Sequence, residues 1–111
     1  MKYSFEDHGP TTVLTLSGEL TSDQADTFRR SCLERLGRGV RNVVLVLEHL
    51  RMIDSAGLEM LLWLREESAQ HRGHLRLVNP DPTIRKVLEV TRLDRRFEVH
   101  QSIESAAKSL R

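Results

Sequence analysis

The order of hydrophobic and polar residues divides the chain into alternating strands and helices. The clearest strand is Asn42–Leu47, in which apolar residues follow one another without the alternation of a half-exposed strand. Such a run is typical of a strand that is covered on both faces of a sheet. Shorter runs of apolar and β-branched residues predict four more strands. These are Tyr3–Asp7, Thr12–Leu16, Leu75–Val78 and Phe97–Val99.

Turn and capping signals mark the ends of the first elements. The pair Gly9–Pro10 predicts a hairpin turn between the first two strands, and Gly18 is expected to end the second strand. Thr21, with Gln24 three residues later, matches a capping box. A helix is therefore predicted from this point to about Leu36.

Three further helices are predicted from the same kinds of signal. The second covers about Ala56–Gln70, where hydrophobic residues recur at helical spacing. The third begins with Asp81 as the N-cap and Pro82 in the first turn. The last begins after Ser102, which is also expected to act as an N-cap.

The predicted element order is ββαβαβαβα, which places the chain in the α/β class. Strands separated by helices favour a mixed, mainly parallel sheet with right-handed crossovers. In such sheets, functional residues gather in the loops that follow the carboxyl ends of the strands. The segment Glu48–Asp54, between the central strand and the second helix, is predicted to be such a loop. No linker or repeat divides the chain, so residues 1–111 are interpreted as one domain.

Composition narrows the class of protein. The chain is 39% hydrophobic and 30% charged, as in ordinary globular domains, and its net charge of +1 gives no general attraction for nucleic acid or an anionic membrane. The segment Met1–Asp7 has no signal-peptide core, and no apolar run reaches the length of a membrane span. A single cysteine suits a reducing compartment. We therefore expect a cytoplasmic protein without direct nucleic-acid or membrane contacts.

Ser55 is the first candidate for chemistry. It directly precedes the second helix, where a serine hydroxyl can cap a free amide, and capping alone would explain it. However, Ala56 and Gly57 are small and leave the hydroxyl open to a partner, although glycine costs a helix about 1 kcal/mol relative to alanine. The free amides and the dipole of a helix N-terminus tolerate a phosphate, which would add about −1.5 to −2 charges. The free-energy cost of the phosphate would fall on a bound partner, through like-charge repulsion and desolvation of the phosphate.

Three segments of the sequence resemble the STAS family, and specifically its anti-sigma factor antagonists. They are Leu16–Leu20 (Leu-Ser-Gly-Glu-Leu), Ile53–Leu58 (Ile-Asp-Ser-Ala-Gly-Leu) and Leu75–Pro80 (Leu-Arg-Leu-Val-Asn-Pro). The stretch Val87–Asp94 adds to a similarity that covers nearly the whole chain. The most specific part is Asp-Ser-Ala-Gly-Leu after a buried strand.

This resemblance implies a partner-switching function. An anti-sigma factor with serine-kinase activity would bind the domain and phosphorylate Ser55 with ATP that the kinase itself holds, so no cofactor or metal of its own is expected. The unphosphorylated form would hold the kinase and free its client, often a sigma factor, and a metal-dependent serine phosphatase would reset the cycle. The residues assigned to partner binding lie in or near the loops around Ser55. They are Gly18, Glu19, Leu20, Thr21, Ser22, Asp23, Asp54, Ala56, Gly57, Leu58, Met60, Trp63, Asn79, Pro80 and Asp81.

The face of the second helix that carries Met60 and Trp63 has two possible interpretations. At 100° per residue, Leu58, Leu61 and Leu62 form one stripe, which we assign to the sheet. Met60 and Trp63 point roughly the opposite way. If exposed, they would be good anchors for a partner. The alternative, weighted equally, is that they pack against a neighbouring helix.

Two departures from the family pattern leave other functions open. Many antagonists carry an acidic residue at the position of Thr21 and another at that of Val46, both near the phosphoacceptor. The second hypothesis is therefore an accessory subunit of an ABC-type lipid transport complex, without a phospho-switch. The third is a scaffold or ligand-sensing module within a larger signalling assembly.

The remaining candidates are weaker. His71 and His74 flank Gly73 at a helix end without a third ligand nearby in the sequence, which disfavours a metal site. The basic cluster after residue 84 is interleaved with acids and has no stacking aromatic except Phe97, which favours a solvated surface over a nucleic-acid site. Cys32 is expected to be a buried, inert thiol. Without a nucleophile–base pair or a phosphate-binding loop, we do not expect an enzyme.

Overall fold

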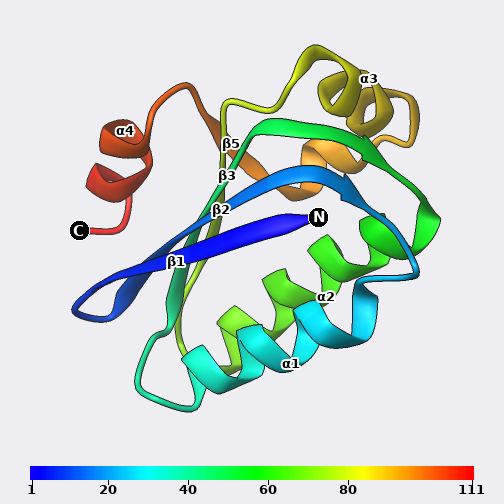
Figure 1. Ribbon diagram of the computed structural model, residues 1–111. Helices are drawn as coiled ribbons and strands as arrows, with labels where there is room; N and C mark the ends of the chain where they lie inside the picture. Colours follow the sequence, from blue (N-terminus) through cyan, green and yellow to red (C-terminus); the bar gives the residue numbers. More distant parts are fainter.

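Strand β3 is the central strand of a five-stranded sheet in the computed structural model, which describes residues 1–111 (Figure 1). The strands are arranged in the order β1-β2-β3-β4-β5, with β1 and β2 antiparallel and all other neighbours parallel. The predicted α/β class and the element order ββαβαβαβα are confirmed. The strands are β1 (Lys2–His8), β2 (Thr11–Leu20), β3 (Asn42–Ile53), β4 (Leu75–Val78) and β5 (Glu98–His100).

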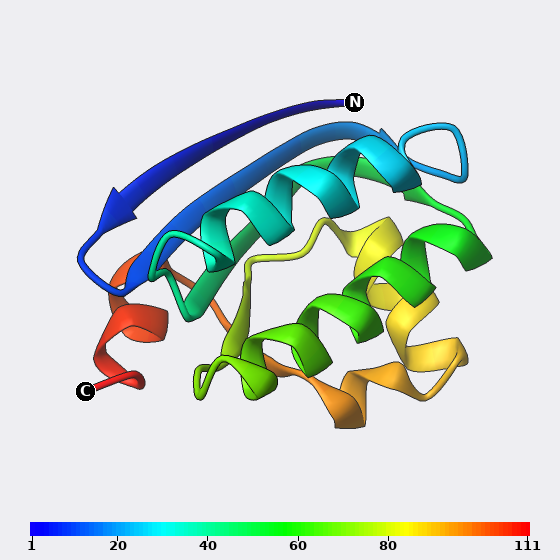
Figure 2. The same ribbon diagram turned by 90° about the horizontal axis from the view of Figure 1, so that it is seen from below.

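Four helices cover the two faces of this sheet. On one face, α1 (Ala25–Leu36) and α2 (Ser55–Gln70) lie side by side, and α3 (Pro82–Val90) contributes to the same core (Figures 1 and 2). The short helix α4 (Ile103–Lys108) packs on the opposite face. A single 3₁₀ turn, η1 (Leu93–Arg96), precedes β5 and was not predicted. None of these helices has both the length and the apolar composition that crossing a membrane requires.

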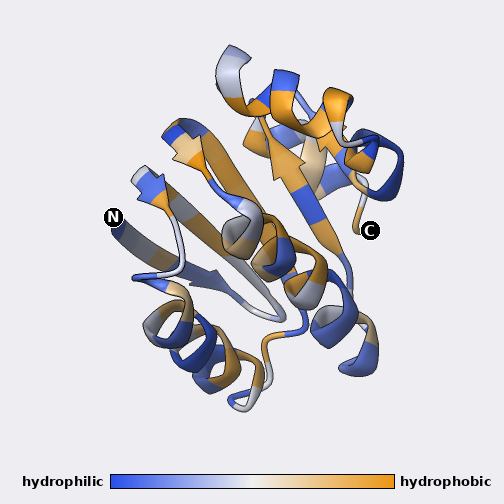
Figure 3. Ribbon diagram, turned by 90° about the vertical axis from the view of Figure 1, so that its right-hand side faces the viewer, coloured by the Kyte–Doolittle hydropathy of each residue, from blue (hydrophilic) through white to orange (hydrophobic).

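The apolar run of β3 is explained by this two-sided cover. Val43, Leu45 and Leu47 belong to the main core of 18 buried residues, together with side chains of α1, α2 and α3. Val44 and Val46 point to the other face, where they form a separate core of four buried residues with Val78 of β4 and Ala106 of α4. The central strands are accordingly the most continuously hydrophobic part of the molecule (Figure 3).

Two predicted strand ends were wrong, because β2 and β3 continue past them. Gly18 does not end β2, and the predicted loop Glu48–Asp54 is strand as far as Ile53, which is paired with Leu20. At two points β3 advances by one more residue than β2, between the partners of Thr15 and Ser17 and between those of Gly18 and Glu19. Such bulges interrupt the alternation of buried and exposed residues, and the extension therefore resembles a loop in the sequence.

The capping signals were correct for α3 and α4 and partly wrong for α1. The Asp81 carboxylate accepts a hydrogen bond from the Thr83 amide (3.0 Å), and Pro82 is in the first turn. Ser102 caps α4 through the Ser105 amide (3.1 Å). For α1, the N-cap residue is Gln24 and not Thr21. The Gln24 side chain reaches back to the Thr21 amide (3.0 Å) and hydroxyl (2.8 Å), which is half of the predicted capping box.

The single thiol gives a first prediction. Cys32 is 2% exposed, and burial raises its pKa to about 12. The thiolate is the reactive form, so near pH 8 the native thiol is both protonated and shielded. We expect Ellman's reagent to label the native protein far more slowly than the protein unfolded in guanidinium chloride. Equal labelling rates for the two states would contradict this burial.

Candidate functional site at the start of helix α2

Ser55 is the first residue of α2 and is exposed, directly after the end of β3. The predicted role of Ser55 as the N-cap was wrong. The N-cap is Asp54, whose side chain accepts a hydrogen bond from the Gly57 amide (Oδ1 to N, 2.8 Å). Aspartate and serine are equally good caps, so the sequence alone could not decide between two adjacent candidates.

The second oxygen of Asp54 links α2 to a different part of the chain. Asp54 Oδ2 accepts a hydrogen bond from the backbone amide of Ser22 (3.2 Å), in the connection between β2 and α1. The Asp54 amide in turn donates to the carbonyl oxygen of Leu20 (3.3 Å). Asp54 therefore fixes the β2–α1 connection beside Ser55, and it brings together two segments that were assigned to partner binding.

The Ser55 hydroxyl is not needed for these contacts. It makes no hydrogen bond within the chain, and the backbone amides of Ser55 and Ala56 have no acceptor in the protein. Free amides at a helix N-terminus carry the positive end of the helix dipole. An oxyanion attached to Ser55 would therefore meet two unused donors and a favourable local field.

Position 57 requires a glycine because of packing, whereas the sequence suggested that it keeps the Ser55 hydroxyl open to a partner. It is buried, and a Cβ at this position would collide with the backbone carbonyl of Leu20 and lie 2.6 Å from Cγ1 of Ile53. The glycine therefore allows the first turn of α2 to approach the end of β2. Its effect on access to Ser55 is indirect, through the placement of the helix.

The residues assigned to partner binding divide into two groups. The side chains of Leu20 and Met60 are buried in the main core, and Pro80 and Gly57 are buried as well, so these side chains are not open to a partner. The half-buried residues are Thr21, Asp54, Ala56, Leu58, Trp63, Asn79 and Asp81. The exposed ones, besides Ser55, are Gly18, Glu19, Ser22 and Asp23.

The face of α2 that carries Met60 and Trp63 packs inward, as the alternative interpretation predicted. Met60 is 3% exposed, and Trp63 packs against the main core. The guanidinium carbon of Arg29, on α1, lies 5.4 Å from the centre of the Trp63 ring. These residues join the two helices, and the expectation of an exposed Met60 was wrong.

The β4–α3 connection is held at the same end of the sheet. The Asp81 amide donates to the carbonyl oxygen of Leu47 (3.4 Å), and Asp81 Oδ1 lies 3.3 Å from Nη1 of Arg51. Asp81 thus repeats the pattern of Asp54, with one oxygen on its own helix and the other on a neighbouring segment. Asn79 has a positive φ of 48°, which asparagine tolerates better than most residues.

Five residues at this end of the sheet are exposed, and we refer to them together as the Ser55 surface. They are Glu19, Ser22, Asp23, Met52 and Ser55, on the extensions of β2 and β3 and the segments that follow them. Met52 is 43% exposed and was missed, because its segment was taken as a loop and the only available signal was a methionine among polar residues. The two acids give this surface a negative character.

The two positions that depart from the family pattern lie in different surroundings. Thr21 is half-buried, and its hydroxyl is bonded to Gln24. Val46 belongs to the small core beneath α4, on the opposite face of the sheet from α2. In this chain, therefore, position 46 does not contribute to the Ser55 surface.

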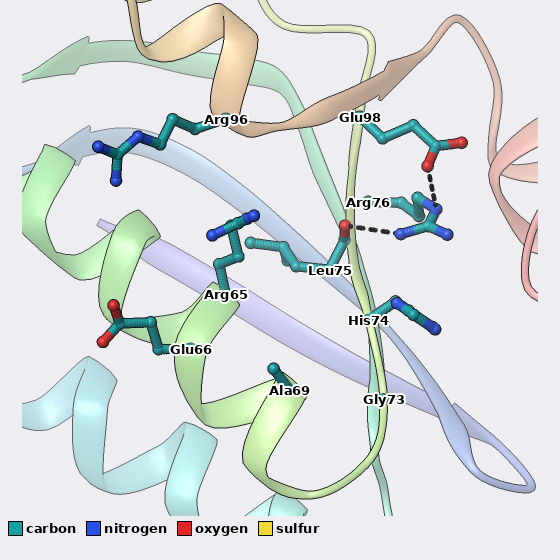
Figure 4. A pocket seen from close by; sticks show the side chains of 9 residues that line it. All are labelled: Arg65, Glu66, Ala69, Gly73, His74, Leu75, Arg76, Arg96 and Glu98. Atoms are coloured by element: carbon teal, nitrogen blue, oxygen red, sulfur yellow. Dashed lines mark hydrogen bonds and ion pairs between the residues drawn. The ribbon is translucent and has the colours of Figure 1, made fainter.

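The cavities of the molecule lie away from Ser55. One polar pocket, of about 300 Å³, lies between the second half of α2, β4 and the turn before β5 (Figure 4). Arg76 is engaged there by Glu98 (3.1 Å) and by the Leu75 carbonyl (3.3 Å). Ser55 lines none of these cavities and is exposed.

Comparisons with known proteins identify the family of the chain. A family model described as the STAS domain matches residues 2–106. BtrV of Bordetella bronchiseptica, whose name assigns it to the anti-sigma factor antagonists, is 30% identical over 111 residues, which cover 100% of this chain and 96% of BtrV.

Two solved structures extend the comparison. A Thermotoga maritima crystal structure assigned to the same class has the same fold, with a TM-score of 0.89 at 24% identity over 97% of this chain and 93% of that one. The phosphorylated form of the Bacillus cell fate determinant SpoIIAA has a TM-score of 0.76 at 27% identity, covering 99% of this chain and all of that one.

The role of Asp54 gives a second prediction. Asp54→Ala removes a helix cap and the link to Ser22, so we expect it to lower the free energy of unfolding by about 0.5–2 kcal/mol for the cap alone. Urea denaturation would measure the loss. The control is Asp23→Ala, which removes an exposed carboxylate without hydrogen bonds and should change stability by less than about 0.5 kcal/mol. Equal effects of the two substitutions would refute the structural role of Asp54.

Proposed function

The chain belongs to the STAS domain family and to its anti-sigma factor antagonists, and we propose that phosphorylation of Ser55 controls its binding to an anti-sigma factor. One observation carries this proposal. Asp54 caps α2, so the exposed hydroxyl of Ser55 has no structural task and can be modified without loss of the fold.

The proposed reaction is a phosphoryl transfer between two proteins. The anti-sigma factor acts as a serine kinase and binds ATP. The Ser55 oxygen forms a bond to the γ-phosphorus, the bond to the β-phosphate oxygen breaks, ADP leaves, and a base of the kinase takes the hydroxyl proton. The antagonist contributes an accessible nucleophile on a rigid helix end. A serine phosphatase restores the hydroxyl by hydrolysis.

The switch follows from where the new charge would be placed. At Ser55 the phosphate is tolerated by the chain itself, because two free amides and the helix dipole face it. A partner packed over the Ser55 surface would instead have to accommodate a bulky, strongly hydrated anion beside Glu19 and Asp23. Desolvation of this anion opposes binding. Phosphorylation therefore releases the partner while the domain remains folded.

The third prediction concerns the modification itself. Incubation with the serine kinase of its partner-switching system and ATP should add one phosphoryl group, detected by intact-protein mass spectrometry. Ser55→Ala should abolish the gain. Ser22→Ala, which removes a neighbouring exposed hydroxyl of the same surface, should leave the stoichiometry unchanged. An undiminished mass gain in Ser55→Ala, or no mass gain in the wild type, would contradict the proposal.

The fourth prediction concerns binding. Ser55→Asp should weaken the affinity for the unmodified partner at least about tenfold, which corresponds to about 1.4 kcal/mol. Ser55→Asn, of nearly the same size without the charge, should weaken it much less. Calorimetry measures both affinities, and urea unfolding should show that both variants stay within about 0.5 kcal/mol of the wild type. Unchanged binding by Ser55→Asp would instead favour a permanent subunit, such as the transporter accessory role.

A further inference from the structure

The free edge of β1 is the longest unpaired strand edge of the sheet. β1 pairs only with β2, and nothing in the chain covers its other side, where it forms the outer margin of the sheet (Figure 2). It has 7 residues, whereas β5 at the opposite edge has 3. The amide and carbonyl groups along such an edge are a template for another strand.

We propose that two copies of the chain associate through this edge, with their β1 strands antiparallel and Ser4 of one copy opposite Ser4 of the other. The two five-stranded sheets then form one continuous sheet across a two-fold axis. The proposal is separate from the phosphorylation of Ser55, because β2 and β3 lie between this edge and the start of α2.

The order of side chains along β1 favours this register. Tyr3 and Phe5 are half-buried and face α1, where the Tyr3 ring lies 6.3 Å from that of Phe28 in an edge-to-face arrangement. Lys2, Ser4 and Glu6 are exposed on the other face. In an antiparallel pair, directly opposite residues share a face. Centring on Ser4 therefore places Tyr3 opposite Phe5 and Lys2 opposite Glu6, twice each by symmetry.

The charged residues of β1 also favour the register centred on Ser4. Lys2 has no ion-pair partner within its own chain, and Glu6 has only the His8 ring nitrogen at 3.2 Å. Charged residues on an edge strand usually prevent pairing with other strands. In the Ser4-centred register, Lys2 and Glu6 instead each meet an opposite charge. A shift of the centre to Phe5 would place Tyr3 against Asp7 and would separate Lys2 from Glu6.

A cysteine cross-link tests the register directly. In the proposed dimer, the two Cα atoms of residue 4 are about 4.5–5.5 Å apart, within the range of about 4.4–6.8 Å that a disulfide spans. Ser4→Cys should therefore form a covalent dimer under mild oxidation, visible on a non-reducing gel. The native cysteine does not interfere, since Cys32 is buried. The control is Lys2→Cys, whose two copies would be about 13 Å apart along the strand and should not cross-link. No cross-link in Ser4→Cys, or equal cross-linking in both variants, would overturn the proposal.

A charge exchange tests the same interface without cysteine. Sedimentation velocity of the wild type should show a dimer whose fraction rises with concentration, because an interface of one short strand pair is small and weak. Lys2→Glu and Glu6→Lys should each weaken association at least about fivefold, since each places like charges opposite one another. The double variant Lys2→Glu/Glu6→Lys restores opposite charges and should recover the wild-type dimer. Failure of the double variant to recover, or a wild type that stays monomeric at every concentration, would refute the register.

Discussion

The two hydrogen bonds accepted by the Asp54 carboxylate are the interaction on which the site depends. One stabilises the first turn of α2, and the other holds the β2–α1 connection through Ser22. Because a single rigid group makes both, helix start and loop are fixed relative to one another. Because Asp54 makes these contacts, Ser55 is exposed at a fixed helix start, as its proposed phosphorylation requires. Gly57 is part of the same constraint, since any larger residue would separate α2 from Leu20.

Much of the fold could be predicted from the sequence, because its strongest signals are local. The continuous apolar run of β3 identified the central strand, and Asp81, Pro82 and Ser102 identified two helix starts correctly. The strand extensions could not be predicted in the same way. The two bulges in β3 follow from its pairing with β2, and they remove the alternation on which strand prediction relies.

The site was predicted less completely than the fold, for reasons of packing. The resemblance of Ile53–Leu58 to a known motif located Ser55, and the structure places Ser55 on an open surface. Helical periodicity left the direction of Met60 open, because α2 is apolar on more than one side and is buried against both the sheet and α1. Met52 was missed because its exposure depends on the bulged end of β3. Each of these outcomes depends on contacts between segments that are far apart in the sequence.

The unequal size of the two cores has a consequence for how the molecule opens. The main core of 18 buried residues lies beneath α1, α2 and α3, whereas the core beneath α4 has only four, one of which is Ala106 of α4 itself. Cooperative units with few buried apolar contacts unfold locally at lower free energy than the whole domain. We therefore expect α4 to detach from the sheet at a lower free energy than unfolding of the whole domain requires. Detachment of α4 would leave the hydrogen bonds of Asp54 intact, because Asp54 does not contact α4 or the small core beneath it.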